Sequence, residues 1–186
     1  MTTATVTTTP ITGDYDIDAA HSRIGFAAKH AMVTTVRGQF SRYTATVHLD
    51  LDNVANTTAT VEIDATSIET GNSQRDDHVR NSDFLEVETY PTITFVSTSA
   101  EQTGEDEFVL HGDLTIKNTT KPVSVTFEKT GAAQDPWGHF RVGFEGKAKI
   151  NRTDWGVSFN APLGTGGLLI SENVTLEFDL AAVKRA

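Results

Sequence analysis

Six histidines have the widest range of possible chemistry in this sequence, because imidazole binds metal ions and transfers protons near neutral pH. They are His21, His30, His48, His78, His111 and His139. No two lie two residues apart on a predicted strand or four apart on a helix, the spacings that direct two imidazoles at one ion. Asp76, Asp77 and His78 are adjacent, so their side chains diverge. The histidines therefore predict no metal site.

The residue types and motifs of the sequence give little support for covalent catalysis. The 186 residues include no cysteine, which excludes disulfides, thiolate metal sites and a cysteine nucleophile. There is no G-x-S-x-G nucleophile turn and no dinucleotide or phosphate loop; Gly164-Thr-Gly-Gly167 leads into Leu-Leu-Ile, as expected of a loop before a strand. No catalytic residue and no cofactor is predicted. An enzyme whose carboxylates meet only in the fold stays open as an alternative.

The histidine that stands out is His30. It follows Ile24, Phe26 and Ala28 at every second position, so it continues an apolar face of a predicted strand. Two interpretations are equally supported: a hydrogen-bonded histidine at a strand end, or a polar contact for a mostly apolar ligand. By the same alternation His48 and His111 fall on outward faces and are expected to be solvated.

Eight segments place apolar residues at every second position, the pattern of strands with one buried and one exposed face. They span residues 24–28, 43–49, 61–64, 93–95, 108–116, 123–128, 140–150 and 174–180. A short ninth strand at Tyr15–Ile17 is an open alternative to this count. Between the strands, residues 70–82 are polar and lack an apolar stripe. We predict a short helix or ordered segment there, covering one end of the sheet.

Antiparallel strands with one apolar face must hide that face and their edges, either in a closed barrel or in two packed sheets. Residues 140–150 extend roughly 37 Å. This is long for a sandwich of this size, but it suits a tilted strand of an eight-stranded barrel with room for one ligand. The sequence therefore predicts an all-β fold, a single eight-stranded antiparallel barrel over residues 14–186, with a sandwich as the alternative.

Charge and the amino-terminal composition limit the partners and the compartment. The net charge of −10 argues against nucleic acid or an anionic membrane surface as the main partner. Residues 1–13 are Thr-rich and are expected to form a flexible leader without the features of a secretory signal. No apolar run is long enough to cross a bilayer, so no stable membrane insertion is expected. These features predict a cytoplasmic protein.

Seven phenylalanines share the inward phase of the predicted strands. They are Phe26, Phe95, Phe108, Phe127, Phe140, Phe144 and Phe178. Such residues either fill a solid core or line an apolar pocket. The sequence leaves both possibilities open.

Several motifs, taken in order, resemble the YceI-like family of lipid-binding barrels. They include 15–22 (YDIDAAHS), Gly38-Gln-Phe40, 67–71 (SIETG), 75–78 (RDDH), Ser82-Asp-Phe84, 90–95 (YPTITF), 112–116 (GDLTI), 120–123 (TKPV), 151–156 (NRTDWG) and 170–174 (ISENV). The resemblance covers nearly all of the chain from Asp14 onward. It implies a lipocalin-like barrel, often a homodimer, that holds polyisoprenoids, isoprenoid quinones or their precursors, or similar lipids.

From the inward phase and these motifs we predict one ligand-binding set. Its members are Phe26, His30, Phe40, Arg75, Asp76, His78, Phe84, Phe95, Leu114, Ile116, Phe127, Phe144, Trp155 and Phe178. His30 is expected near the tunnel mouth, with Arg75, Asp76 and His78 supporting the loop around it. Pairing of Arg75 with Asp76 to cap that segment is an equally supported structural role.

The leading hypothesis is therefore non-catalytic binding, storage or transport of a long apolar ligand. An enzyme acting on a lipid-like substrate in the same cavity is the alternative. A stress-related interaction module with a solid core is the third possibility.

Overall fold

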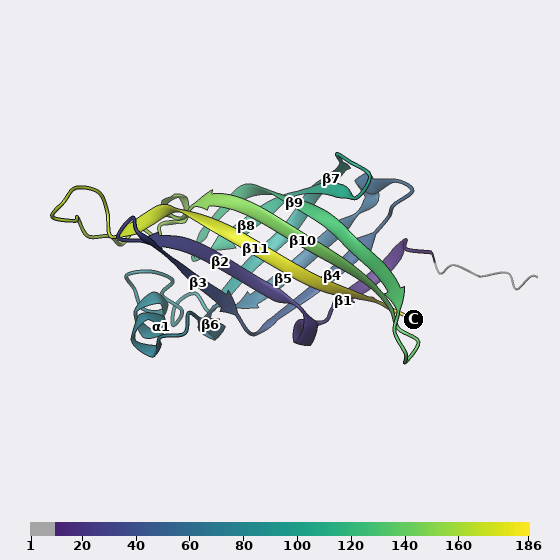
Figure 1. Ribbon diagram of the computed structural model, residues 1–186, viewed down its shortest axis with the longest axis horizontal. Coiled ribbons are helices and arrows are strands. Elements are labelled where there is room, and N and C mark those ends of the chain that lie inside the picture. The colour runs from purple at the N-terminus through teal and green to yellow at the C-terminus, as the bar shows by residue number, and fades with distance from the viewer. Residues whose placement is uncertain (1–9) are drawn as a thin grey trace, which may run out of the picture.

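Alternating apolar residues produce strands that curve into a closed antiparallel barrel in the computed structural model, which describes residues 10–186 (Figure 1). The first five strands are β1 (Gly13–Ile17), β2 (Arg23–His30), β3 (Thr34–Phe40), β4 (Tyr43–Leu49) and β5 (Thr58–Asp64). The remaining six are β6 (Ile68–Glu69), β7 (Thr92–Gln102), β8 (Glu107–Ile116), β9 (Thr119–Gln134), β10 (Phe140–Asn151) and β11 (Ile170–Lys184). The prediction of an eight-stranded antiparallel barrel is confirmed, because three barrel strands are each built from two segments.

The first of these composite strands consists of β1 and β2. Both segments pair with the same edge of β11: Tyr15 lies opposite Lys184, and Ile24 lies opposite Phe178. The second consists of β3 and β4, which pair with β2 and β1 respectively. The third consists of β5 and β6, which pair with β4 and β3 respectively. The Tyr15–Ile17 segment is therefore the first half of a barrel strand and not an additional one. Residues 34–40 form β3, although they were not among the eight alternating segments.

Each composite strand is interrupted by side chains that take over backbone hydrogen bonds. Between β1 and β2 the chain turns through the 3₁₀ helix η1 (Ala19–His21), where the Asp18 carboxylate accepts a 3.0 Å bond from the Ala20 amide. Between β3 and β4 the amide of Arg42 donates to the hydroxyl of Ser67, at 3.1 Å. Ser67 is buried in the 3₁₀ helix η3 (Ala65–Ser67). Two further 3₁₀ helices are η2 (Val54–Asn56) and η4 (Arg152–Trp155).

The polar segment between β6 and β7 contains the helix α1 (Ser73–Arg80), which confirms the short helix expected within residues 70–82. The Asn72 side chain caps it by accepting a bond from the Arg75 amide. At the other end, Arg80 donates to the carbonyls of Thr66 and Ile68 at 3.0 and 2.8 Å. These bonds hold α1 at one end of the barrel (Figure 1).

Two apolar clusters divide the interior. The larger contains Ile24, Ile63, Ile93, Leu114, Val125, Ile150 and Trp155 among its buried members. The smaller contains Tyr15, Leu49, Val142 and Ala182 and lies where β1 closes the ring against β4 and β11. Burial raises the pKa of Tyr15 to about 12. The smaller cluster lies at the end of the barrel away from α1.

Residues 1–9 of the leader that was predicted for residues 1–13 lie outside the described residues. Of the rest, Ile11 packs against the smaller cluster and Gly13 begins β1. Among residues 10–186, no helix combines the length and apolar character that a membrane crossing requires.

Arg141 joins the break between β1 and β2 to the β9–β10 turn. Its guanidinium donates to Asp18 and to Asp135, each at 2.8 Å. Bonds from Arg141, and for Asp18 also from His21, lower the pKa of both carboxyl groups from 3.8 to about 2. A carboxyl group whose pKa is lowered by folding stabilises the folded state when the pH is above its pKa in the unfolded chain. This stabilisation is lost as the pH falls through the pKa of the folded state.

We therefore expect the free energy of unfolding to decrease as the pH falls from about 4 to about 2. Arg141→Gln should lower stability at neutral pH and flatten this dependence. Urea titrations of both proteins across a pH series measure the effect. Parallel curves for the two proteins would show that the cluster does not couple folding to pH.

Candidate ligand-binding site

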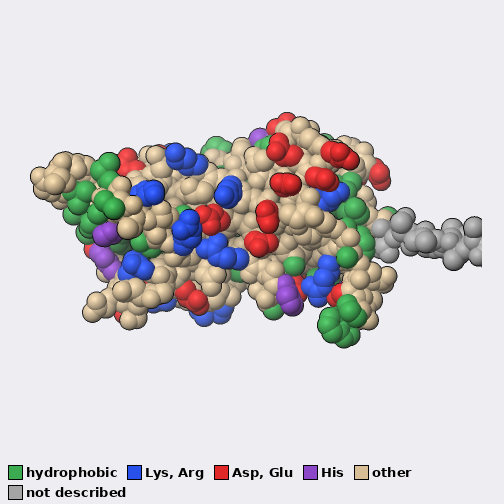
Figure 2. All heavy atoms as spheres, in the orientation of Figure 1, with side chains coloured by type: hydrophobic (Ala, Val, Ile, Leu, Met, Phe, Trp, Pro, Cys, Tyr) green, Lys and Arg blue, Asp and Glu red, His purple; other side chains and the backbone are tan. Residues whose placement is uncertain are grey.

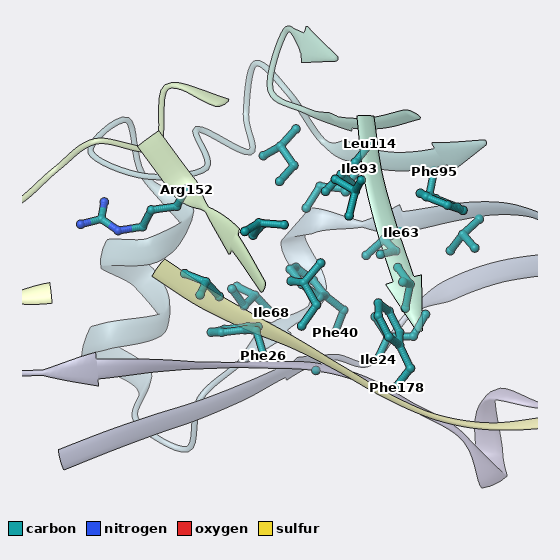
Figure 3. Close-up of a pocket in the computed structure, with 18 of the residues that line it drawn as sticks. Ile24, Phe26, Phe40, Ile63, Ile68, Ile93, Phe95, Leu114, Arg152 and Phe178 are labelled. Atoms are coloured by element: carbon teal, nitrogen blue, oxygen red, sulfur yellow. The ribbon is translucent and has the colours of Figure 1, made fainter. Parts of the chain in front are cut away.

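A long cavity of about 710 Å³ runs through the barrel. This volume lies within the usual range of small-molecule sites, roughly 300–1,000 Å³. Apolar side chains from opposite walls, among them Phe26, Phe40, Ile93 and Phe95, project toward one another around it (Figure 3). Along β8 the lining extends from Ile116 to Phe108, eight residue steps or roughly 27 Å. Of the two possibilities that the sequence left open, the structure therefore shows an apolar pocket and not a solid core.

Three glycines explain why the inward phenylalanines leave this space free. Each lies beneath a ring from a neighbouring strand: Gly38 beneath Phe26, Gly112 beneath Phe95, and Gly146 beneath Phe127. A Cβ atom on any of them would lie 2.3–2.4 Å from the ring, closer than real contacts allow. The missing side chain therefore lets each ring lie against the barrel wall instead of standing in the lumen.

Polar groups line the cavity mainly at the α1 end. Within residues 10–186, the lining residues that are also exposed are Lys29, His30, Asn72 and Gln74. The first two end β2, and the other two lie at the start of α1. The cavity thus opens to solvent at this end, while the smaller apolar cluster occupies the other end.

His30 lies at this mouth, opposite Ile170 on β11 and Thr34 on β3. It is exposed and lines the cavity, so its imidazole is within reach of the polar end of a bound molecule. His48 and His111 lie on the outer surface, where they contact Asp14 at 2.7 Å and Glu101 at 3.0 Å.

Thr70 organises the segment that leads into α1. The Arg75 guanidinium donates to the Thr70 hydroxyl at 2.7 Å and to its carbonyl at 2.8 Å. The Asp76 carboxylate, which is buried, accepts from the Thr70 amide at 2.8 Å and from its hydroxyl. Arg75 lines the cavity and Asp76 does not. Both residues brace the loop through Thr70 instead of capping it by pairing with each other.

An aromatic cluster joins α1 to the loop before β11. The imidazole of His78 meets the rings of Phe84 and Phe159 edge-on, with centroids 5.0 Å apart in both cases. Its Nε2 atom lies 2.8 Å from the Asp83 carboxylate. Phe159 lines the cavity but was absent from the predicted set, because it lies in a loop where no strand alternation indicates its direction.

Trp155 is the other predicted residue that the cavity does not reach. It is buried in the larger cluster, and its indole Nε1 donates to the Leu114 carbonyl at 2.9 Å. The twelve remaining predicted residues line the cavity: Phe26, His30, Phe40, Arg75, His78, Phe84, Phe95, Leu114, Ile116, Phe127, Phe144 and Phe178.

Arg152 is a buried charge that the sequence analysis did not single out. Its guanidinium donates to the carbonyls of Ser171, Val157 and Ile170, at 2.9, 2.6 and 3.4 Å. Burial lowers the pKa of Arg152 from its usual value. In Figure 3 this side chain points away from the apolar residues. Arg152 therefore fastens the loop before β11 to the mouth of the barrel.

This arrangement can hold a long apolar molecule that has one polar end. The interior offers apolar surface along its length and polar contacts at one end. Among residues 10–186, no group of three or more His, Asp or Glu side chains is placed to hold a metal ion.

Comparison with known proteins identifies relatives over most of the chain. Residues 15–182 match the YceI-like domain. A UPF0312 protein of Vibrio cholerae is 35% identical over 146 residues, 77% of each chain. The crystal structure of BcnA from Burkholderia cenocepacia is 26% identical, with a TM-score of 0.79, and covers 89% of this chain and 99% of that one.

A more distant match concerns the fold alone. It is a polyisoprenoid binding domain from Saccharophagus degradans, implicated in plant cell wall breakdown, at 15% identity and a TM-score of 0.66. The alignment covers 92% of this chain and 98% of that one.

Proposed function

The chain belongs to the YceI-like family, and on that premise we propose that it binds a long apolar molecule with one polar end, without catalysing a reaction on it. A polyisoprenoid, an isoprenoid quinone or its precursor, or a similar lipid has this chemistry. The name of the Saccharophagus degradans domain supports the isoprenoid class.

The observation that carries the proposal is the distribution of polarity along the cavity. Apolar side chains line it from Phe108 to Ile116, while His30 and Arg75 lie at its open end. A bound amphiphile would place its tail in the tube and its polar group at the mouth. An enzyme would instead need polar groups converging around a reacting atom.

The energetics of such a site depend on length. Each methylene removed from water contributes about 0.8 kcal/mol. Ten of them therefore supply about 8 kcal/mol, comparable to a micromolar Kd before ordering costs are subtracted. Affinity should therefore rise with tail length until the tail fills the cavity.

Native mass spectrometry of the protein purified from its host, followed by organic extraction, tests the proposal. We expect a co-purifying lipid that is released intact. If no lipid is recovered and labelled long-chain alcohols do not bind, the proposal is wrong. A product that accumulates with added lipid and disappears in the His30→Ala and His78→Ala variants would favour the enzyme alternative.

Replacing His30 with alanine tests the polar end separately from the tail. We expect about tenfold weaker binding of a long-chain alcohol, because one hydrogen bond of roughly 1–1.5 kcal/mol is lost. Binding of an alkane of equal length should not change. Fluorescence competition titrations measure both ligands, and His111→Ala on the outer surface is the matched control. Equal losses for the alcohol and the alkane would show that His30 acts through packing alone.

A further inference from the structure

The mouth of the cavity carries an exposed apolar tip made of two segments. In the β2–β3 turn, Met32 is 68% exposed and Val33 is 78% exposed; in the loop before β11, Leu168 is 39% exposed. The two segments touch: the Ala31 amide donates to the Leu169 carbonyl at 2.7 Å, and the Met32 thioether lies over Gly167. Residues 31–33 and 162–168 therefore form one surface, which we call the mouth tip.

The mouth tip is continuous with the cavity wall. His30 precedes the turn, while Phe159 and Leu169 flank the loop, and all three line the cavity. Figure 2 shows hydrophobic side chains gathered at this end of the molecule, whereas most acidic side chains on the visible face lie toward the other end. A lipid leaving or entering the cavity would pass beside this surface.

Charged residues are missing from both segments. Residues 31–36 and 155–171 contain no Asp, Glu, Lys, Arg or His, although 22% of the chain is charged. Lys29 and Arg37 flank the turn, and Asp154 and Glu172 flank the loop. A surface without charges can enter a lipid interface without desolvating ions, which is otherwise costly.

The turn geometry gives an independent reason to assign Met32 a role. The Val33 amide bonds to the His30 carbonyl at 3.0 Å, and the two central residues have positive φ angles, 51° at Ala31 and 61° at Met32. Such a two-residue hairpin turn favours Asn-Gly, because glycine has no Cβ atom and asparagine tolerates a positive φ better than other residues with one. Asn or Gly at position 32 would adopt this backbone conformation with less strain. Contact with an apolar surface outside the protein would account for the exposed methionine at this position.

We propose that the mouth tip docks reversibly on the surface of a neutral lipid bilayer, so that the ligand moves between membrane and cavity without crossing water. This inference rests on the proposed function, which requires a ligand that is scarcely soluble in water. The net charge of −10 disfavours an anionic surface, which makes a zwitterionic bilayer the favoured occupant.

The test combines vesicles of phosphatidylcholine with the double variant Met32→Asn/Val33→Ser. Asparagine tolerates the left-handed conformation, so the melting temperature should stay equal or rise. We expect about tenfold less protein to co-float with vesicles and about tenfold slower uptake of a fluorescent farnesol from them. The affinity for the same probe delivered by cyclodextrin should not change.

The matched control is Trp137→Ser, in the β9–β10 turn at the opposite end of the barrel. Trp137 is 79% exposed, so this change also removes a large exposed apolar side chain. It should leave flotation and uptake unchanged.

The outcomes separate the two proposals. Unchanged flotation and uptake in the double variant, with probe binding intact, overturn the docking inference and leave the proposed function standing. A wild-type protein that binds no probe from cyclodextrin contradicts the proposed function. A third outcome is that sedimentation velocity shows a dimer of the wild-type protein and a monomer of the double variant, while vesicle binding is unchanged. The mouth tip would then be a contact surface for a second copy of the chain.

Discussion

Replacing Gly146 with alanine is expected to weaken binding of long-chain ligands about 100-fold while leaving short-chain ligands unaffected. The new Cβ atom would lie 2.4 Å from the Phe127 ring, which must then leave the wall. Phe127 pairs with Phe108 on β8, toward the inner end of the cavity. A ring turned into the lumen there would exclude the end of the tail. The loss of three to four buried methylenes, at about 0.8 kcal/mol each, corresponds to an increase in Kd of about 100-fold.

Titrations with a series of labelled alcohols of increasing length measure the effect. The matched control is Gly131→Ala on β9, because a Cβ atom there meets nothing within 4 Å. Combining Gly146→Ala with Phe127→Leu should restore binding, since the smaller side chain leaves room for the added methyl group. If the single variant binds every chain length as the wild type does, the glycine beneath Phe127 does not keep the lumen open.

Replacing Arg152 with methionine is expected to lower the free energy of unfolding by about 3 kcal/mol. Methionine resembles the aliphatic part of arginine, but it removes the Arg152 donor from the carbonyls of Val157 and Ser171. The Ile170 carbonyl keeps only the bond from the Asn160 side-chain amide, at 2.7 Å. Because these carbonyls belong to the loop before β11 and to its first residues, the loop should also exchange its amide hydrogens faster. Urea unfolding and hydrogen exchange measure the two effects.

Two comparisons separate the guanidinium geometry from its charge. Arg152→Lys keeps the charge but cannot bond all three carbonyls in the same way, so it should be nearly as destabilising. Arg42→Met removes a surface arginine whose side chain is 62% exposed beside Asp64, and it should cost at most about 1 kcal/mol. A fully stable lysine variant would show that the charge, and not the fork of donors, stabilises the loop.

The glycines and the buried arginine perform complementary tasks. Gly38, Gly112 and Gly146 keep the walls flat within the tube, whereas Arg152 holds the loop that borders its mouth. The proposed function depends on both, because a long tail needs an unobstructed lumen and a polar end needs an ordered rim.

Most of the cavity wall could be predicted from the sequence. Phe95, Leu114 and Phe178 line the cavity, as their positions in alternating segments indicated. The pleat of a strand turns successive side chains to opposite faces, so the inward set is a local property that one segment reveals by itself. The short polar helix near residue 76 was also predictable from local sequence, because that segment lacks the apolar stripe of a core helix.

Only the tertiary structure decided whether that wall encloses a space. The lumen stays open because Gly146 lies opposite Phe127 on the neighbouring strand, a pairing that depends on the register. The inward burial of Trp155 and the three carbonyls held by Arg152 likewise join segments distant in the sequence. Alternation is set within a strand, whereas cavity volume is set by which side chains meet across strands once the barrel closes.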